Sequence, residues 1–147
     1  YEIGVRLVGS EMCIRDSTKS VRPWQHVLEP LSGYMLLTAK IWEEPTKYCE
    51  GWNFGPRAES ITSVWDVAND VVKNYGSGGL NDISIPNAPH EARFLMLDIS
   101  KAKFQLGWEP RMNIHQCVAL TVDWYKRYTF ENVYSLCVDQ IKQYLIK

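Results

Sequence analysis

The sequence lacks the features that mark membrane proteins, nucleic-acid-binding proteins and disordered chains. No apolar run approaches the ~18 residues that a membrane-spanning helix needs. Its 16 basic and 17 acidic residues give a net charge of -1, so no field for binding a polyanion is implied. With 46% hydrophobic and 12% aromatic residues, the 147-residue chain can bury a sizeable core, and its length suits one domain rather than two.

The sequence also lacks the motifs of several enzyme classes. The pair His90-Glu91 begins like a zinc-binding H-E-x-x-H motif, but Phe94 occupies the position of the second histidine. No G-x-S-x-G elbow occurs, and no tyrosine has a lysine four residues later. The glycine cluster at 76–79 lacks a third glycine in register and follows a predicted helix, whereas a dinucleotide-binding loop follows a strand. No catalytic residue and no metal ligand is therefore predicted.

The four cysteines, at positions 13, 49, 117 and 137, show no C-x-x-C spacing. A chain this rich in apolar residues does not need disulfides to fold, so buried, reduced thiols are expected. Reduced thiols are typical of the cytoplasm. The first residues show no basic segment followed by an apolar one, as a signal peptide would. A cytoplasmic protein is expected.

Residues 1–17 show no clean helical or strand period. The string over residues 8–17 resembles the translated read-through of a sequencing adaptor, so residues 1–17 are interpreted as non-native sequence. Residues 18–147 are interpreted as the domain that carries the function. The alternative for the first part is a short strand over residues 3–8 and a turn over residues 11–15.

From residue 18 the sequence predicts one α/β unit in which short strands alternate with helices. The expected strands cover residues 21–27, 51–56, 83–85 and 93–97. The expected helices cover residues 29–42, 61–75, 100–106, 113–128 and 133–145. Ser60 or Thr62 should cap the second helix, Gly76 should end it, and Asn113 should cap the fourth. On the first helix, one face carries Leu31, Tyr34, Met35, Thr38, Ile41 and Trp42.

Two segments carry side chains that suit a phosphorylated, hydroxyl-rich ligand. V-R-P-W-Q-H-V at 21–27 places Arg22 beside a tryptophan at the edge of a predicted strand. A planar guanidinium can bind two phosphate oxygens at once. P-H-E-A-R at 89–93 adds a second guanidinium, an imidazole and a carboxylate, and the carboxylate suits ribose or sugar hydroxyls. The candidate binding residues are Arg22, His90, Glu91 and Arg93.

A structural interpretation of the same residues stays open. Arg22 and Arg93 would then form ion pairs with the carboxylates of Glu29, Glu91 or Asp98. The tryptophans would likewise serve as core residues rather than as platforms for a ligand. Spacing alone does not decide between the two interpretations.

Six motifs follow one another along the chain. They are R-P-W-Q-H-V-L-E-P-L-S-G-Y at 22–34, E-G-W-N-F-G-P at 50–56, P-H-E-A-R at 89–93, L-D-I-S-K-A at 97–102, L-G-W-E-P at 106–110 and W-Y-K at 124–126. In this order they resemble the C-terminal part of the CDP-glucose 4,6-dehydratase family, a branch of the extended short-chain dehydrogenases/reductases. The first motif is specific to that branch, whereas L-D-x-S-K-A and L-G-W-x-P recur in related nucleotide-sugar dehydratases and epimerases. Residues 14–18 only imitate the I-R-N-P strand that precedes R-P-W in the family.

The resemblance implies an α/β substrate-binding lobe whose Rossmann domain is missing. Members of the family convert CDP-glucose into CDP-4-keto-6-deoxyglucose: a bound NAD takes a hydride from C4, water leaves across C5 and C6, and the hydride returns to C6. NAD and the catalytic tyrosine, lysine and threonine belong to the N-terminal domain. Carried over by position, Arg22 and Arg93 would contact the pyrophosphate, and His90 and Glu91 would face the nucleotide.

The resemblance also implies a parent protein that is a cytoplasmic, homodimeric lyase of deoxysugar biosynthesis, with the chain itself inactive. One alternative is the same lobe from another sugar-nucleotide epimerase or dehydratase. Another is an interaction module that binds no nucleotide. In either enzyme reading, the surface that would face the Rossmann domain is expected to be apolar and to favour association.

Overall fold

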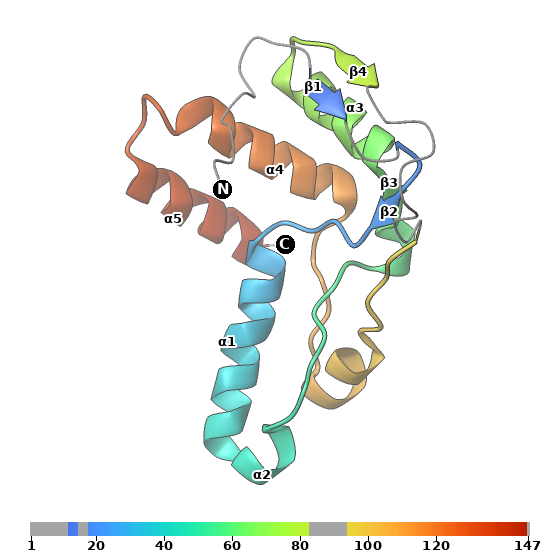
Figure 1. Cartoon of the computed structure of the whole chain (residues 1–147). Helices are drawn as coiled ribbons and strands as arrows, with labels where there is room; N and C mark the ends of the chain where they lie inside the picture. Colours follow the sequence, from blue (N-terminus) through green and yellow to red (C-terminus); the bar gives the residue numbers. More distant parts are fainter. Residues whose placement is uncertain (1–11, 15–17, 83–93, 147) are drawn as a thin grey trace.

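The computed structural model describes residues 12–14, 18–82 and 94–146. Figure 1 shows α3, α4 and α5 gathered at one end of the molecule, while α1 extends away from them towards α2. The elements in chain order are β1 (Met12–Ile14), β2 (Val21–Arg22), α1 (Leu28–Glu43), α2 (Pro45–Tyr48), η1 (Ala58–Ser60), β3 (Thr62–Ser63), α3 (Val64–Tyr75), β4 (Leu80–Asp82), η2 (Ala102–Leu106), α4 (Ile114–Arg127) and α5 (Val133–Ile146). This mixture of short strands and helices confirms the predicted α/β class.

One small sheet pairs β1 with β4. The two strands run parallel, with Met12 opposite Leu80 and Ile14 opposite Asp82. β1 lies within residues 11–15, where the alternative interpretation of the sequence expected a turn. The strand predicted at 83–85 lies outside the described residues, and β4 ends immediately before it.

A second small sheet pairs β2 with β3. The strands are antiparallel, with Val21 opposite Ser63 and Arg22 opposite Thr62. The prediction of a strand over 21–27 is wrong in its length, because β2 stops at Arg22. Pro23 has no N–H group with which to continue the ladder. Of the strand predicted at 93–97, the described part makes a single parallel bridge, from Phe94 to Val21.

The first predicted helix is confirmed as α1, but most of the expected apolar face is exposed. Leu31 and Tyr34 are exposed, Met35 is 75% exposed and Trp42 is 90% exposed. The other face carries the buried Gly33 and packs Leu36, Leu37 and Ile41 against a core cluster. α1 therefore has apolar side chains on two faces. One of them packs against the first core cluster, and the other is largely exposed in the described part of the chain.

The segment 51–56, predicted as a strand, is not a strand. It runs back from α2 beside α1 as an extended trace (Figure 1), and Trp52 and Phe54 pack into the same cluster as the inner face of α1. A strand needs a neighbouring backbone to pair with. No other described segment forms a ladder with this one.

The remaining helices agree with their predicted bounds, with changes at the caps. Ser63, rather than Ser60 or Thr62, caps α3: its Oγ accepts a hydrogen bond of 3.1 Å from the backbone N–H of Asp66. Gly76 ends α3 as predicted, with φ 88°. The helix predicted at 100–106 contains the π-helical turn η2, which Gly107 ends.

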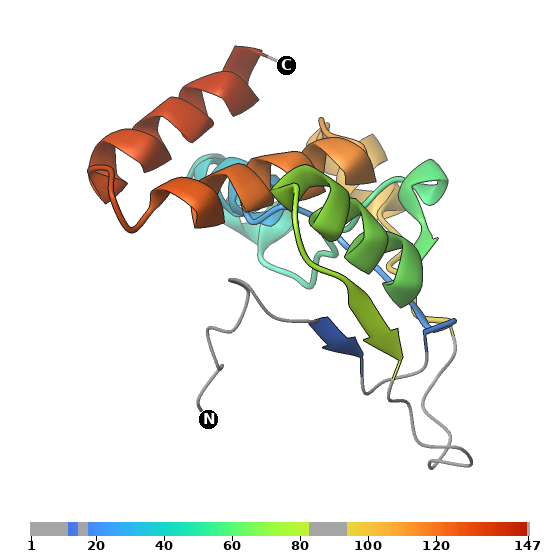
Figure 2. The same ribbon diagram turned by 90° about the horizontal axis from the view of Figure 1, so that it is seen from above.

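The predicted cap of α4 is confirmed. Asn113 Oδ1 accepts from the backbone N–H of Gln116 at 2.9 Å, and Gln116 Oε1 accepts from the backbone N–H of Asn113 at 3.0 Å. This reciprocal capping box satisfies two donors at the start of the helix. α5 follows over nearly the predicted range. Figures 1 and 2 both show α4 between α3 and α5.

The described residues form three buried clusters. The first consists of Tyr48, Phe54, Ala102, Leu106 and Trp108. The second consists of Met112, Cys117, Leu120 and Tyr144. The third consists of Ile114, Val118 and Val122, with Trp24 packed against it. α4 contributes to the second and third clusters, so it holds α3 and α5 together, while α1 packs on the first.

We predict that Gly33→Ala destabilises the fold. A Cβ at this position would lie 2.3 Å from Phe54 Cδ1, far inside van der Waals contact. Overpacking of this kind costs about 1–3 kcal/mol, which exceeds the gain of about 1 kcal/mol that alanine brings to a helix. Chemical denaturation should show a lower free energy of unfolding. The control is Gly51→Ala, where a Cβ meets nothing within 4 Å; equal effects of the two changes would contradict the prediction.

Candidate functional site

Of the four predicted binding residues, Arg22 lies within the described part of the chain. It ends β2, is half-buried, and donates from Nη1 to the carbonyl oxygen of Val21 at 3.0 Å. The backbone N–H of Leu95 donates to the same carbonyl at 3.2 Å. The chain therefore returns to the side of β2 directly after residue 93. The predicted binding residues His90, Glu91 and Arg93 lie outside the described residues, and their placement stays a prediction.

Asp98 and Glu29 were two of the predicted ion-pair partners of Arg22 and Arg93. In the structure, the carboxylates of both accept hydrogen bonds from other groups. Asp98 Oδ1 accepts from the backbone N–H of Ser100 at 2.8 Å. The hydroxyl and the backbone N–H of Ser100 hold the pKa of Asp98 below its usual range. Glu29 is fully buried and accepts from the segment that precedes α4.

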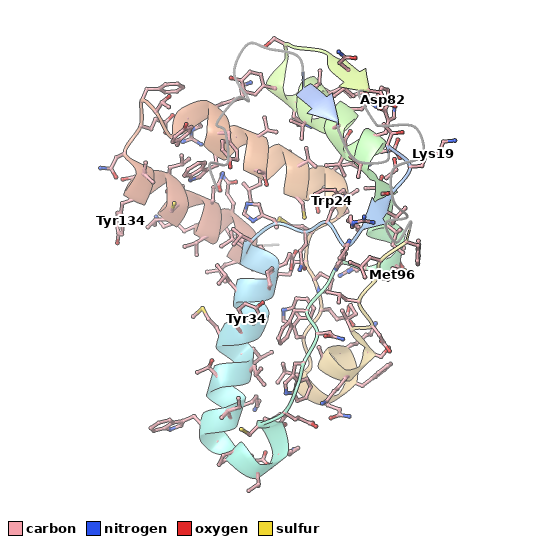
Figure 3. The ribbon with its side chains drawn as sticks, in the orientation of Figure 1. Lys19, Trp24, Tyr34, Asp82, Met96 and Tyr134 are labelled. Atoms are coloured by element: carbon pink, nitrogen blue, oxygen red, sulfur yellow. The ribbon has the colours of Figure 1, made fainter. Side chains whose placement is uncertain are left out.

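Three buried polar atoms flank Arg22 without a hydrogen-bond partner in the described part of the chain. They are Ser20 Oγ, Trp24 Nε1 and Gln25 Oε1. Buried polar groups are nearly always paired in folded proteins. Figure 3 places Trp24 beside the start of α4, and its side chain packs against the third cluster there. Three buried polar atoms without a hydrogen-bond partner among the described residues therefore lie within three residues of Arg22.

A cavity of about 530 Å³ opens next to this segment, between the start of α1 and the helices α4 and α5. Its walls are mainly apolar and aromatic. Gln25 connects the cavity to the segment of Arg22, and its Nε2 donates to the carbonyl oxygen of Phe54 at 3.0 Å. His26 is buried in the wall, where Nδ1 accepts from the backbone N–H of Leu28 at 3.2 Å. The lining residues are Gln25, His26, Val27, Leu28, Leu31, Thr121, Trp124, Tyr125, Cys137, Gln140 and Ile141.

Behind the cavity, the carboxylate of Glu29 holds three donors from distant parts of the chain. Oε1 accepts from the backbone N–H groups of Arg111 at 2.9 Å and Met112 at 2.7 Å. Oε2 accepts from the Tyr144 hydroxyl at 2.9 Å. The carboxylate thereby ties α1 to the start of α4 and to α5.

Ser32, one turn after Glu29, extends this network to the first cluster. Its Oγ donates to the Glu29 carbonyl oxygen at 2.7 Å and accepts from Trp108 Nε1 at 2.9 Å. The Tyr144 hydroxyl lies 2.8 Å from the same Oγ. Burial raises the pKa of Tyr144 to about 12, and the hydrogen bond to the Glu29 carboxylate contributes to the shift. The network is a structural junction rather than a reactive site.

The described residues do not fit a bound NAD or a metal ion. In this part of the chain, no group of three or more His, Cys, Asp or Glu side chains could hold a metal. The glycine turn at 76–79 follows α3 and leads into β4, the reverse of the strand–turn–helix order that cradles a pyrophosphate. No helix among residues 12–14, 18–82 and 94–146 is long and apolar enough to span a membrane.

The cysteines differ in their burial. Cys117 is buried as predicted, and Cys137 is half-buried in the cavity wall. Cys49 is exposed, so the prediction of a buried thiol is wrong there. It follows the one-turn helix α2 at the far end of α1, where little of the described chain covers it.

Comparison with known proteins identifies the relatives of this chain. No family model matches it. It is 45% identical to a CDP-glucose 4,6-dehydratase of Salmonella typhimurium over 107 residues, which is 73% of this chain and 30% of the relative. It is 46% identical to a dTDP-glucose 4,6-dehydratase of Xanthomonas campestris over 132 residues, which is 84% of this chain and 36% of the relative. The chain thus spans about a third of the length of these relatives.

Solved structures show the same fold. A dTDP-glucose 4,6-dehydratase of Bacillus anthracis in complex with NAD superposes with a TM-score of 0.63 at 18% identity, covering 80% of this chain and 35% of that one. A UDP-glucose 4-epimerase of Thermotoga maritima with UDP-glucose gives a TM-score of 0.61 at 26% identity, covering 82% and 36%.

The fold and the matches define the class of protein. The chain is similar to a C-terminal portion of extended short-chain dehydrogenases/reductases, and the relatives and structural neighbours found are nucleotide-sugar dehydratases and epimerases. Within this class, the resemblance to CDP-glucose 4,6-dehydratase found in the sequence motifs is confirmed.

We predict that Glu29→Ala destabilises the chain by about 3 kcal/mol, because one buried N–H group, one part-buried N–H group and one buried hydroxyl lose their acceptor. Urea denaturation measures the change. Glu43→Ala is the matched control, since Glu43 is exposed and forms an ion pair with Lys40 on the same helix. Its removal should cost less than about 0.5 kcal/mol. A similar loss in both variants would contradict the junction role of Glu29.

We predict that stability falls as the pH rises from about 10 to 12, and that Tyr144→Phe removes part of this fall. The unfolded tyrosine loses its proton near pH 10, whereas the folded Tyr144 keeps it until about 12. The contribution of Tyr144 is therefore complete below pH 10 and lost as the pH passes 12. Thermal melts of both proteins across this range test it. Parallel pH profiles for the wild type and the variant would show that Tyr144 does not contribute.

Proposed function

We propose that residues 18–147 form the substrate-holding lobe of an NAD-dependent nucleotide-sugar 4,6-dehydratase and that the substrate is CDP-glucose. The bridge between Val21 and Phe94 carries this proposal. It brings Phe94, the residue that follows the P-H-E-A-R motif, beside the strand that ends at Arg22, although the two lie about seventy residues apart in the sequence. The 45% identity to a CDP-glucose 4,6-dehydratase supports the choice of reaction.

In this proposal the chain binds and orients the substrate. Arg22 and Arg93 bind the pyrophosphate through their planar, permanently charged guanidinium groups. His90 and Glu91 face the nucleotide.

The chemistry of hydride transfer belongs to a part of the parent protein that this chain does not contain. NAD, when bound there, takes up and returns the hydride, and no step of that transfer is assigned to the residues of this chain. The lobe holds the glucose unit in place over the cofactor. The chain alone is therefore proposed to be inactive, residues 1–17 are proposed to have no role in it, and the parent is proposed to be a cytoplasmic, homodimeric lyase.

A second candidate substrate is another nucleotide sugar. The Xanthomonas campestris relative is a dTDP-glucose 4,6-dehydratase and is 46% identical, and the Thermotoga maritima neighbour is a UDP-glucose 4-epimerase. All three nucleotides share the pyrophosphate that Arg22 is proposed to bind. They differ in the base, and dTDP also lacks the ribose 2′-hydroxyl that CDP and UDP carry.

We predict that the 147-residue chain binds CDP, and that Arg22→Ala weakens the binding at least tenfold. A charge-assisted hydrogen bond is worth about 1.5–3 kcal/mol, which corresponds to a factor of about 10 to 100. Isothermal titration with CDP, dTDP and UDP measures the affinity for each and ranks the three nucleotides. Lys142→Ala removes one positive charge from an exposed site on α5 and should leave binding unchanged.

The titrations separate the hypotheses. Tightest binding of CDP supports the proposed substrate, and tightest binding of dTDP or UDP supports the second candidate. A folded chain that binds none of the three contradicts a nucleotide-holding role and favours an interaction module. Equal losses in Arg22→Ala and Lys142→Ala would contradict the role of Arg22.

A further inference from the structure

The segment over residues 97–101 lies alongside the segment over residues 50–55, and in the described part of the chain no backbone ladder joins them. In Figure 1 both segments run between the lower end of the molecule and the small sheet of β2 and β3. Their contacts follow an antiparallel order, and the pairs are Lys101 with Gly51, Asp98 with Asn53, and Leu97 with Gly55. Side chains therefore make the connection that backbone hydrogen bonds make in a sheet.

Lys101 makes three contacts through its single ammonium group. Nζ lies 2.9 Å from Glu50 Oε1, donates to the carbonyl oxygen of Gly51 at 2.9 Å, and lies 4.5 Å from the centre of the Trp52 ring. A single ion pair on a protein surface contributes little. A cation that holds a carboxylate, a carbonyl oxygen and an aromatic ring together fixes one backbone segment relative to another.

Asn53 and Gly55 continue the connection in the direction of β2. Asn53 Nδ2 donates to the carbonyl oxygen of Asp98 at 3.3 Å. A Cβ at position 55 would lie 2.9 Å from Leu97 Cβ, which is closer than two such atoms can approach without a shift. The close approach of the two segments therefore depends on the absence of a side chain at Gly55.

Both segments also contact β2 or the residues that follow it. The backbone N–H of Leu95 donates to the carbonyl oxygen of Val21 at 3.2 Å. The carbonyl oxygen of Phe54 accepts a hydrogen bond of 3.0 Å from Gln25 Nε2. The three stretches of chain thus support one another, and the position of Leu95 beside β2 depends on how firmly the other two are held together.

We propose that Lys101 is a positioning residue for the candidate site. Its ammonium group holds the 97–101 segment against the 50–55 segment and thereby fixes the backbone at Leu95 beside the strand that ends at Arg22. The consequence for ligand binding rests on the proposed function, because the P-H-E-A-R motif ends immediately before residue 94. The consequence for the backbone is independent of that function.

Amide hydrogen exchange, followed by NMR on the 147-residue chain, tests the position of the backbone. Lys101→Met keeps the aliphatic stem and removes the ammonium group. The Leu95 amide should then exchange about fivefold faster or more, because its hydrogen bond opens locally. The Cys117 amide, which donates to the carbonyl oxygen of Asn113 at the start of α4, should not change. Lys101→Arg retains the positive charge and should restore slow exchange at Leu95.

Lys103→Met is the matched control. Lys103 also forms an ion pair at the surface, with Glu109 at 2.9 Å. Its partner lies nearby in the sequence, whereas the partners of Lys101 lie in a distant segment. Lys103→Met should therefore leave the exchange of both amides unchanged, although it removes the same charge from the same part of the surface.

A second pair of variants changes the opposite segment and carries the test if Lys101→Met does not fold. Gly55→Ala adds a Cβ that meets Leu97, so it should also speed the exchange of Leu95. Gly51→Ala adds a Cβ that meets nothing within 4 Å and should leave the exchange of Leu95 unchanged.

Titration with CDP measures the consequence for the candidate site. If residues 94 and 95 must lie beside β2 for the ligand to bind, Lys101→Met should weaken CDP binding about fivefold or more, in parallel with the local opening. Lys101→Arg should restore the affinity, and Lys103→Met should leave it unchanged.

Each outcome decides the question. Faster exchange at Leu95 alone, together with weaker CDP binding, upholds the proposal. Unchanged exchange at Leu95 overturns it, and so does an equal acceleration at Leu95 and Cys117, which indicates a general loss of stability. Faster exchange at Leu95 with unchanged CDP binding overturns the role of Lys101 in the site. Faster exchange at Leu95 in a chain whose wild type binds no CDP upholds the positioning of the backbone and contradicts the proposed function.

Discussion

The arrangement of the chain depends on the buried carboxylate of Glu29. It lies at the start of α1, whose inner face packs on the first cluster, and it accepts hydrogen bonds from the segment before α4 and from α5, which carry the second cluster. Ser32 and Trp108 complete the connection on the side of the first cluster. Such a group must be fully satisfied, because an unpaired buried carboxylate is far more costly than an apolar residue in the same place. The orientation of α1 relative to α4 and α5 follows from this requirement.

The sequence predicted those features that depend on neighbouring residues. The helical period of 61–75, the glycine that ends it and the Asn113 cap all act within a few residues. The structure has the helix over 64–75, ended by that glycine, and Asn113 caps α4. The features that it missed depend on distant contacts. Glu29 was expected as a helix start or an ion-pair partner, because nothing in its surroundings indicates donors 82 to 115 residues away. The strand expected at 51–56 has the composition of a strand, but pairing requires a neighbour that the described residues do not supply.

For the candidate site too, the sequence predicted local features, and the structure was needed for the contacts between distant segments. Spacing alone left the choice between a phosphate contact and an ion pair open for Arg22, and the order of six motifs along the chain pointed to the nucleotide-sugar enzymes. The fold adds the spatial relation that composition could not provide, since the bridge from Val21 to Phe94 joins the residue before one motif to the residue after another. The apolar character of α1 was visible in the sequence. The structure was needed to show which face of α1 packs against the core. The ring of Phe54 fills the space next to Gly33, where a side chain would otherwise lie.

The position of the donors to Glu29 also determines when the chain can finish folding during synthesis. The acid is made 115 residues before its last partner, Tyr144. Contacts of such long separation form late, because the intervening chain must first be ordered. While the ribosome is still translating, α1 therefore exposes an unsatisfied carboxylate and apolar side chains, and a nascent chain that stalls before α5 is a natural target for chaperones.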